Sequence, residues 1–257
     1  DAWHDVQPTD PQTNSWSFSV KEGPARIGVQ LHVQPGPWVE AGPSYRDQEA
    51  LVLDSFEDLA PYLANQGDRQ NVTFVAQGEG GATLQGVTQD LSLTDQDARE
   101  GKCAVYSAES SLPENTGWSV IGKRFNPPLD LSWHKAIGFW LRGDGKGGLF
   151  KLQLLDGSKA ADFYIANDYT GWRYQQLPRP QTDAIDYSRV SILNLYYNGL
   201  PAKTAVSCAI DDIKALRNID TQTVSNPWVE LDGRRLGWNV SVSQGQFVFL
   251  WPGEPAR

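Results

Sequence analysis

The sequence is poor in the residues that build metal cages and nucleic-acid surfaces. Its 257 residues contain two cysteines, three histidines and no methionine. Two cysteines are too few for a thiolate zinc site of the zinc-finger kind. Lys and Arg number 22 against 31 Asp and Glu, a net charge of −9, and no basic run is present. Non-specific nucleic-acid binding requires clustered cations, so we expect no nucleic-acid partner.

Long apolar runs are also missing. None approaches the roughly 18 residues that a membrane helix needs, so we expect no membrane span. Because methionine is absent even at position 1, we expect Asp1 to begin a processed or trimmed product. This expectation agrees with a secreted or extracellular protein, with the cell surface and the periplasm as alternative locations.

Helix signals are scarce. Only residues 55–66 show a helical pattern, and Pro61 interrupts it. Short alternating runs such as FKLQLLD (150–156) dominate instead, separated by Gly, Pro, Asp and Asn. Many short strands between turn residues predict an all-β sandwich or barrel rather than βαβ units.

The chain falls into three zones. A polar, Pro-rich start precedes the longest series of strands, and WVELDGRRLGW near the end predicts a hairpin around Asp232–Gly233. Neither flank alone can bury a good core, so we predict that residues 14–46 and 227–254 pair into one small β-unit, with the central domain inserted between its halves. The predicted boundaries are residues 1–48, 49–217 and 218–257.

Aromatic residues are the abundant feature: ten Trp, nine Tyr and nine Phe. They are either core residues or flat faces that stack on sugar rings. Alternation along five strands predicts one outward surface that combines aromatic, basic and amide groups. Its predicted members are Trp140, Arg142, Lys151, Gln153, Asp162, Tyr164, Arg173, Gln175, Asn194 and Tyr196.

That surface has three interpretations. Aromatic rings can stack on pyranose faces while Arg, Asp and amide groups bond the hydroxyls, which favours a glycan ligand. The alternatives are an ordinary solvated sheet and a face covered by the N-terminal zone. An acidic polysaccharide is also a possible ligand, because the surface contains three basic residues, Arg142, Lys151 and Arg173. The net negative charge of the chain opposes such a ligand at long range.

Two adjacent carboxylates interrupt an apolar run in AVSCAIDDIKAL, residues 205–216. Neighbouring side chains on a strand point to opposite faces, so one of Asp211 and Asp212 should face solvent while the other points inward or lies at a bend. An inward carboxylate needs a metal ion, an arginine or backbone donors as its partner.

Several of these segments together resemble the galactose-binding-like β-sandwich, in particular the family 11 carbohydrate-binding modules. The resemblance covers roughly residues 50–217, and its most specific parts are FWLRGDGKGG (139–148) and AIDDI (209–213). It implies a jelly-roll β-sandwich that binds a single glycan chain on its concave face. The other matching segments are LDSFEDL (53–59), EGKCAVYS (100–107), FKLQLLDG (150–157) and GWRYQQLP (171–178).

The resemblance also implies a structural Ca²⁺ ion at one edge of the sandwich. Its ligands would be Glu57, with Asp54 as a substitute, carbonyl groups of residues 100–102 including that of Lys102, and Asp211. Carboxylate and carbonyl oxygens are the ligands that Ca²⁺ takes. The alternative is that Asp211 or Asp212 caps a bend or pairs with an arginine.

The two cysteines, Cys103 and Cys208, each lie in a strand-like run. They form either a disulfide or two buried thiols. The strand order implied by the resemblance places them near each other and so favours the disulfide.

Catalytic signals are weak. His4, His32 and His134 lie in separate segments, and no paired acids for glycoside hydrolysis are evident, although Asp162 with Asp144 or Asp168 is a conceivable pair. We therefore predict a non-catalytic carbohydrate-binding module, secreted and bacterial, which binds polysaccharide beside a glycoside hydrolase or lyase in the same parent chain. The alternatives are a polysaccharide hydrolase or lyase, and a protein-docking structural sandwich.

Overall fold

The chain divides into two compact units. The structure is a computed structural model that describes residues 26–33, 40–63, 81–181, 184–221, 224–225, 228–231, 234–237, 241–242 and 245–252. One unit consists of Asp1–Pro35 with Thr221–Arg257, and the other is Gly36–Asp220. Within the described residues, no helix has the length and apolar character needed to cross a membrane.

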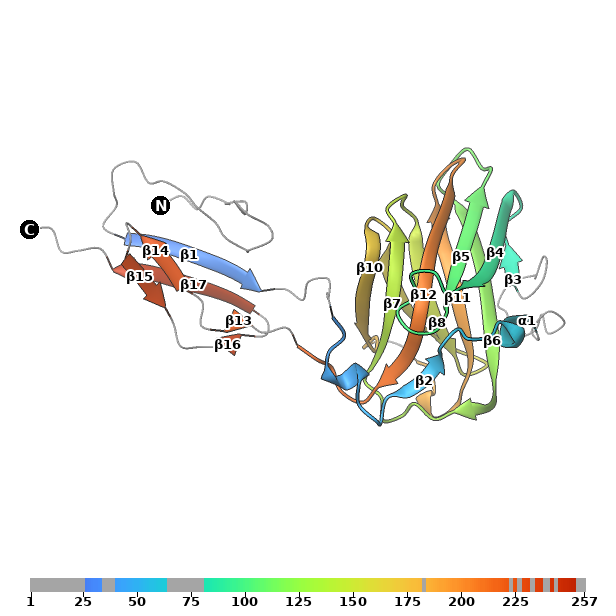
Figure 1. Ribbon diagram of the computed structural model, residues 1–257, viewed down its shortest axis with the longest axis horizontal. Coiled ribbons are helices and arrows are strands. Elements are labelled where there is room, and N and C mark those ends of the chain that lie inside the picture. Colours follow the sequence, from blue (N-terminus) through green and yellow to red (C-terminus); the bar gives the residue numbers. More distant parts are fainter. Residues whose placement is uncertain are drawn as a thin grey trace, which may run out of the picture. The chain divides into compact units, whose positions relative to one another are not determined.

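The larger unit is a β-sandwich of two antiparallel sheets, seen as two layers in Figure 1. The described residues of the first sheet form six strands in the order β10–β7–β12–β5–β4, with β2 paired to β12. These strands are β2 (Leu51–Asp54), β4 (Val87–Thr94), β5 (Cys103–Ser110), β7 (Ala136–Asp144), β10 (Thr170–Pro178) and β12 (Ala205–Leu216). The all-β sandwich that the strand pattern predicts is confirmed.

The second sheet has the order β3–β6–β11–β8–β9. Its strands are β3 (Gly81–Thr83), β6 (Gly117–Leu129), β8 (Leu149–Leu155), β9 (Ala160–Ala166) and β11 (Val190–Leu200). In the part of the chain that the structure describes, three short helices lie between strands: η1 (Pro43–Tyr45), α1 (Ala60–Leu63) and η3 (Tyr187–Arg189).

The core lies between the two sheets. Alternate residues of each strand point into it, as the sequence predicts for Phe139 and Leu141 in β7 and for Phe150 and Leu152 in β8, all of which are buried. Fully burying a side chain of this size stabilises the fold by roughly 1.5–3 kcal/mol. The intervening residues of each strand point outward, and they form the candidate sites described below.

A β-bulge in β12 explains the paired carboxylates. The pairing of β12 with β7 shifts register between Asp211 and Lys214, and Asp212 has a positive φ of 48°. The extra residue lets both carboxylates lie on the outer side of the first sheet, while Ile210 and Ile213 remain in the core. The expectation that one of the two carboxylates faces solvent is wrong, because Asp211 and Asp212 are both buried. The bend expected for the other is found, at Asp212.

The larger unit begins before the predicted boundary at residue 49. Ser44 donates to the Asp220 carboxylate through its backbone N–H and its hydroxyl, and the Tyr45 hydroxyl donates to the carboxylate and the carbonyl of Asp212. These bonds connect residues that are about 170 positions apart in the sequence, a separation the local pattern could not reveal. They make the segment before β2 part of the sandwich, which therefore starts at Gly36 and ends at Asp220.

The smaller unit pairs the two ends of the chain. β1 (Arg26–Val33) runs antiparallel to β17 (Gly245–Pro252). β14 (Trp228–Leu231) pairs with β15 (Arg234–Gly237), with Leu231 opposite Arg234, as expected for the predicted hairpin; its turn residues 232–233 lie outside the described residues. β13 (Val224–Ser225) pairs with β16 (Ser241–Val242).

The predicted disulfide is wrong. Both cysteines are buried free thiols. Cys208 lies opposite Tyr106 and faces the core, whereas Cys103 begins β5 three residues before Tyr106 and therefore faces the other side of the sheet. The pairing of β5 with β12 brings the two strands side by side, but strand alternation directs the two cysteine side chains to opposite faces of the sheet.

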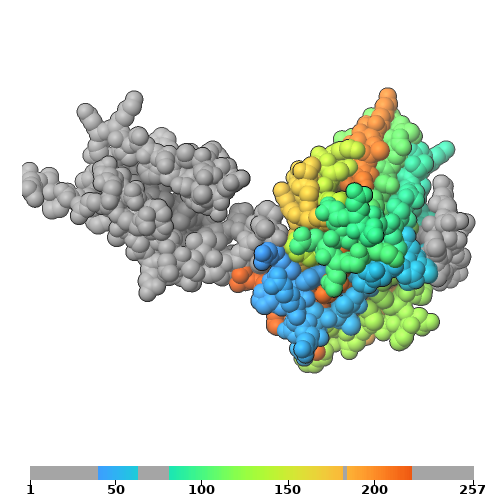
Figure 2. Space-filling model, viewed as in Figure 1, coloured from blue at the N-terminus to red at the C-terminus, as the bar shows by residue number. Residues whose placement is uncertain are grey.

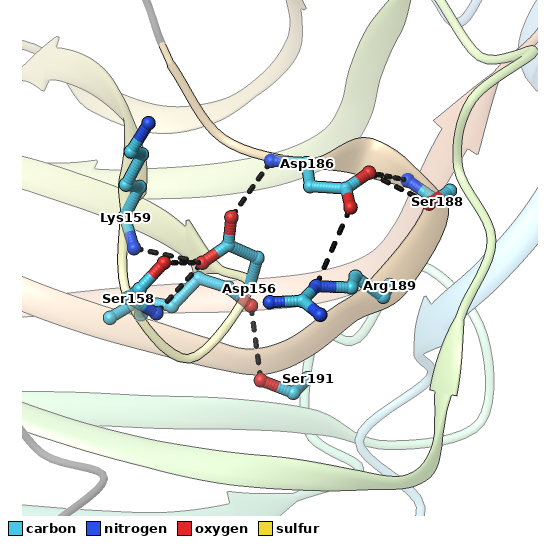
Figure 3. Close-up of polar contacts among 8 residues, drawn as sticks. Asp156, Ser158, Lys159, Asp186, Ser188, Arg189 and Ser191 are labelled. Carbon is cyan, nitrogen blue, oxygen red and sulfur yellow. Dashed lines mark hydrogen bonds and ion pairs between the residues drawn. The ribbon is translucent and has the colours of Figure 1, made fainter.

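The loop from β8 to β9 is joined to the segment before η3 by one carboxylate, shown in Figure 3. Asp156 accepts hydrogen bonds from the backbone N–H groups of Ser158 and Lys159 and from the Ser158 hydroxyl, and its other oxygen accepts from the N–H of Asp186. Burial alone would raise the pKa of Asp156, but these hydrogen bonds lower it to a net value below its ordinary range.

We expect Asp156→Asn to lower the free energy of unfolding by about 2 kcal/mol more than Asp130→Asn, because hydrogen bonds to a charged group contribute about 1.5–3 kcal/mol. Asp130 is a matched control: it accepts the same two bonds from a serine two residues later, without a bond from a distant loop. Because the folded-state pKa of Asp156 is lowered, its contribution is present above about pH 4 and is lost as the pH falls further. Urea unfolding at pH 7 and pH 3 measures both effects, and equal losses for the two variants would contradict the role of Asp186.

Candidate functional site

The predicted ten-residue surface is split between the two sheets. Lys151, Gln153, Asp162, Tyr164, Asn194 and Tyr196 come from β8, β9 and β11 of the second sheet. Trp140, Arg142, Arg173 and Gln175 come from β7 and β10 of the first sheet. The prediction of one common surface is therefore wrong, because alternation within a strand cannot tell which sheet the strand joins.

The six residues of the second sheet form one connected network, which we call the polar face. Register places Asn194 opposite Gln153 and Gln153 opposite Asp162, so their side chains lie on the same side of the sheet. Gln153 Nε2 donates to Asp162 Oδ1 at 2.7 Å. Its Oε1 accepts from Asn194 Nδ2 and from the Tyr196 hydroxyl, each at 3.1 Å. Gln153 is thus the centre of the polar face.

Asp162 connects this network to solvent. Its Oδ2 accepts from the Tyr164 hydroxyl at 2.9 Å and from Lys151 Nζ at 3.4 Å. The Asp162 side chain is 32% exposed and Tyr164 is 51% exposed, whereas Lys151 is 8% exposed. Lys151 Nζ also lies 4.0 Å from the centre of the Tyr196 ring. The accessible groups of the polar face are therefore a tyrosine ring and a carboxylate, each held in place by buried neighbours.

The pKa values at the polar face follow from its burial. Burial lowers the pKa of Lys151 from its ordinary value, although the Asp162 carboxylate partly opposes this. Burial and the hydrogen bond to Asp162 raise the pKa of Tyr164. At neutral pH the tyrosine is protonated and donates its hydrogen bond to Asp162. The carboxylate accepts three hydrogen bonds in all, so about one of its four acceptor sites is left for a further hydroxyl group.

On the first sheet, Trp140 is not an exposed stacking platform. It is 7% exposed, and the guanidinium of Arg99 lies 3.9 Å from the centre of its ring. Figure 2 shows the loop between β4 and β5, in green, and the segment around η1, in blue, over this side of the sheet. Both segments cover residues that the strand pattern alone predicted to face solvent.

Arg173 and Gln175 point away from the face predicted for them. They lie opposite Leu141 and Phe139, which are core residues, so they share the core-facing side of the first sheet. There the Arg173 guanidinium lies 4.0 Å from the Tyr169 ring centre, and Gln175 donates to the Tyr169 hydroxyl. β10 is an edge strand, so polar side chains reach solvent at the rim of the core.

The outward residues of β10 are instead Trp172 and Tyr174, which would have to face the core if Arg173 and Gln175 faced outward as predicted. They lie opposite Arg142 and Trp140, and Tyr174 packs in one apolar cluster with Trp140 and Tyr45. Arg142 pairs with Asp97 at 2.6 Å, and Trp172 donates to the Asp97 carbonyl. Trp172 and Tyr174 can face either the core or the outer side of the sheet, so the alternation along β10 did not indicate which side they occupy.

Asp54, the substitute calcium ligand, is engaged elsewhere. Its carboxylate accepts from Lys123 Nζ, the Tyr62 hydroxyl and the N–H of Phe56. Among the described residues, no three His, Cys, Asp or Glu side chains gather into a metal-binding group. A calcium site would therefore depend on backbone carbonyls in addition to Glu57 and Asp211.

Glu57 and Asp211 do contact the same loop. Glu57 accepts from the N–H of Lys102 at 3.0 Å, and Asp211 Oδ2 accepts from the N–H groups of Arg99 and Glu100. Asp211 is fully buried, and its Oδ1 has no hydrogen-bond partner. Burial raises the pKa of Asp211 to about 6, despite the two amide hydrogen bonds. A buried carboxylate oxygen without a partner fits a cation, so the donor set is compatible with Ca²⁺.

Asp162 and Asp144, one of the acid pairs considered for hydrolysis, belong to different sheets. Asp162 lies on the second sheet, whereas Asp144 ends β7 on the first. The Asp144 carboxylate accepts from Asn167 Nδ2 and from the N–H groups of Lys146 and Ser207. These bonds give Asp144 a structural role at the end of the strand.

The fold and the polar face together define a β-sandwich with a preorganised surface of tyrosine, carboxylate and amide groups. No family model and no curated protein matches this chain. Among solved structures, a family 11 carbohydrate-binding module from Clostridium thermocellum, in complex with a β-1,3-1,4-mixed-linked tetrasaccharide, is similar at 14% identity and a TM-score of 0.46, covering 65% of this chain and 95% of that chain.

Two further solved structures are similar to this chain, one a binding module and the other an enzyme. The family 11 module of the cellulosomal cellulase Lic26A-Cel5E of Clostridium thermocellum is 14% identical, with a TM-score of 0.45, and the match covers 65% of this chain and 94% of that one. An agarase is 10% identical, with a TM-score of 0.43, over 68% of this chain and 25% of its own. Family 11 carbohydrate-binding modules, which the sequence segments resemble, are therefore among the solved structures similar to this chain.

Proposed function

We propose that this chain is a non-catalytic carbohydrate-binding protein that binds a polysaccharide on the polar face. The observation that carries the proposal is the half-exposed Tyr164 ring beside the Asp162 carboxylate. A tyrosine ring can stack on the apolar face of a pyranose, and a carboxylate beside it can accept the hydroxyl groups at the rim of the same sugar.

The polar face is organised before any ligand arrives. Asp162 receives hydrogen bonds from Gln153, Tyr164 and Lys151, so its carboxylate has little rotational freedom to lose. Preorganisation of this kind raises affinity because binding does not have to order the side chains. Lys151 and Gln153 are less than 10% exposed, whereas lysine and glutamine on an ordinary solvated sheet are mostly exposed.

Affinity electrophoresis tests this function. The purified chain is run through gels that contain neutral or acidic polysaccharides, and released products are assayed in the same samples. Retardation by a glycan without products supports a binding module. Products would move the assignment to a hydrolase or lyase, and no retardation on a broad panel would favour a protein-docking sandwich.

We expect Tyr164→Ala to weaken glycan affinity on the order of tenfold, which corresponds to about 1.4 kcal/mol of stacking and hydrogen bonding. Trp133→Ala is a matched control, because Trp133 is 72% exposed but lies in the loop between β6 and β7, outside the polar face. A loss of affinity in the Trp133 variant alone would place the ligand elsewhere and contradict the proposed face.

We further propose one structural Ca²⁺ ion, bound by Glu57, Asp211 and carbonyl oxygens of residues 100–102. Support comes from the buried Asp211 oxygen that has no partner and from the shared loop contacted by both carboxylates. The ion would stabilise the ionised form of Asp211, which burial disfavours, and would connect the first motif of the sandwich with its last strand.

Calcium is expected to raise the melting temperature of the wild-type chain, and EGTA to lower it, because an ion that binds only the folded state stabilises it. Asp211→Asn should remove this dependence. Asp97→Asn is the control and should retain the calcium dependence, because Asp97 lies in the same β4–β5 loop but its carboxylate pairs with Arg142. Equal melting temperatures of the wild-type chain in calcium and in EGTA would contradict the site.

Secretion, and a glycoside hydrolase or lyase as the associated enzyme, complete the proposal. Their support is the proposed polysaccharide ligand, because a chain that binds polysaccharide would hold such an enzyme near its substrate. Detection of the chain in the culture medium of its natural host, rather than in the cell lysate, tests the first of these.

A further inference from the structure

A second polar site lies on the opposite sheet from the polar face. It is a cavity of about 250 Å³ lined by residues of the η1 segment, the β4–β5 loop, β7 and β12. This volume is below the roughly 300–1,000 Å³ of typical small-molecule sites, so it suits one sugar unit rather than a glycan chain. The residues that determine its chemistry are Tyr45, Arg46, Arg99, Trp140, Asp212 and Lys214.

The cavity is locally cationic in a chain of net charge −9. Its lining contains Arg46, Arg99 and Lys214 against Glu100 and Asp212. Asp212 is already neutralised, since Lys214 Nζ lies 2.8 Å from its Oδ2 and the Tyr45 hydroxyl donates to the same oxygen. Within the described part of the chain, neither arginine has an ion pair with a carboxylate.

Arg99 is held in position without an ion pair to a carboxylate. The Asp211 carboxylate binds the backbone N–H of Arg99 at 2.7 Å, and the guanidinium lies over the Trp140 ring. A guanidinium held over a ring keeps its N–H donors at its edge, where they can bind a planar or tetrahedral oxyanion in a bidentate manner. Most exposed arginines are mobile, so a fixed guanidinium without a carboxylate partner indicates a site for an anion.

The backbone around the cavity is also unusual. The β12 bulge puts Asp212 at a positive φ of 48° and turns its carboxylate toward Tyr45 and Lys214. Bulges and strained residues occur often beside binding sites, because they redirect side chains that a regular strand would point elsewhere. Here the bulge supplies the bond that fixes Tyr45 and Lys214 as walls of the cavity.

We propose that this cavity binds the carboxylate or sulfate group of an acidic sugar unit, through Arg99 and Arg46. The anion site follows from the cavity itself, and the sugar as carrier of the anion rests on the proposed carbohydrate-binding function. A chain with this site and the polar face would contact an acidic glycan on both sheets of the sandwich.

The test is isothermal titration of the full chain with galacturonate, galactose 6-sulfate, galactose and inorganic sulfate at constant ionic strength. Each compound is titrated into the wild-type chain and into the Tyr164→Ala chain, in which binding at the polar face is weakened. In both chains at least one of the two acidic sugars should bind saturably and more tightly than galactose. Arg99→Gln should weaken this binding by about tenfold or more, because it removes a charge-assisted bidentate contact.

Arg189→Gln is the charge-matched control, since Arg189 is exposed, pairs with Asp186 and does not line the cavity. Arg46→Gln provides a second variant at the site, and unchanged thermal unfolding verifies that each variant folds. No saturable binding of either acidic sugar would overturn the inference. Binding that survives Arg99→Gln and Arg46→Gln but is lost in Tyr164→Ala would also overturn it, while leaving the proposed function intact. Sulfate that binds as tightly as galactose 6-sulfate would overturn the sugar as carrier.

Discussion

Lys123→Met is expected to lower the free energy of unfolding by about 3–5 kcal/mol, because it leaves a buried carboxylate without its cation. Lys123 Nζ lies 2.8 Å from Asp54 Oδ2 and donates to the Leu53 carbonyl at 2.6 Å. The two side chains are only 11% and 7% exposed. The bond joins β6 of the second sheet to β2 of the first, so it also connects the two layers.

Chemical unfolding of a double-mutant cycle measures this pair. Asp54→Asn alone leaves the buried Lys123 charge without its carboxylate. In the Lys123→Met background that charge is absent, so Asp54→Asn should lower the free energy of unfolding by less. Arg189→Met breaks an exposed pair with Asp186 and should change stability by no more than about 1 kcal/mol. A Lys123→Met cost as small as that of Arg189→Met would contradict the buried pair.

Gln153→Met is expected to lower stability by about 2–4 kcal/mol and also to weaken glycan binding. The substitution removes three hydrogen bonds, to Asp162, Asn194 and Tyr196. Asn194 is fully buried, and its Oδ1 already has no partner, so loss of Gln153 leaves a desolvated amide at a cost of about 1–3 kcal/mol. Asp162 loses its shortest hydrogen bond and with it a fixed orientation for sugar hydroxyls.

The matched control for this prediction is Gln89→Met. Gln89 has the same side chain and bonds two partners, against three for Gln153: the Val120 carbonyl and the Tyr106 hydroxyl. It lies on β4 of the first sheet. Both variants should be less stable than the wild type, and only Gln153→Met should lose glycan affinity. Equal affinities of the two variants, measured well below their melting temperatures, would contradict a role of Gln153 in organising the polar face.

The strand pattern alone predicted which residues of most strands enter the core. Phe150, Leu152 and Leu193 are buried as expected, because a period of two is a local property of the backbone. The partners of those strands are not local. β8 pairs with β9 and β11 rather than with β7, and this choice divides the predicted ten-residue surface into two. Six of its members remain together as the polar face.

Edge strands and bulges limited the sequence analysis further. In β10 both alternate sets contain apolar and polar residues, so Trp172 and Tyr174 were assigned to the wrong side. In β12 the bulge at Asp212 changes the alternation for one residue, and only the pairing register reveals it. The Cys103–Cys208 prediction was wrong for the related reason that strand proximity does not specify side-chain direction.

The sequence by itself determined the all-β class, the long central series of strands and the residues of most core positions, because these depend on composition and on short-range alternation. The tertiary structure decided which strands share a sheet, which loops cover Trp140 and where Asp54 finds its partner. These features depend on contacts between residues far apart in the chain, such as Lys123 with Asp54 and Tyr45 with Asp212. Local patterns contain no information about such contacts, since every strand of a sandwich presents the same alternation to several neighbours.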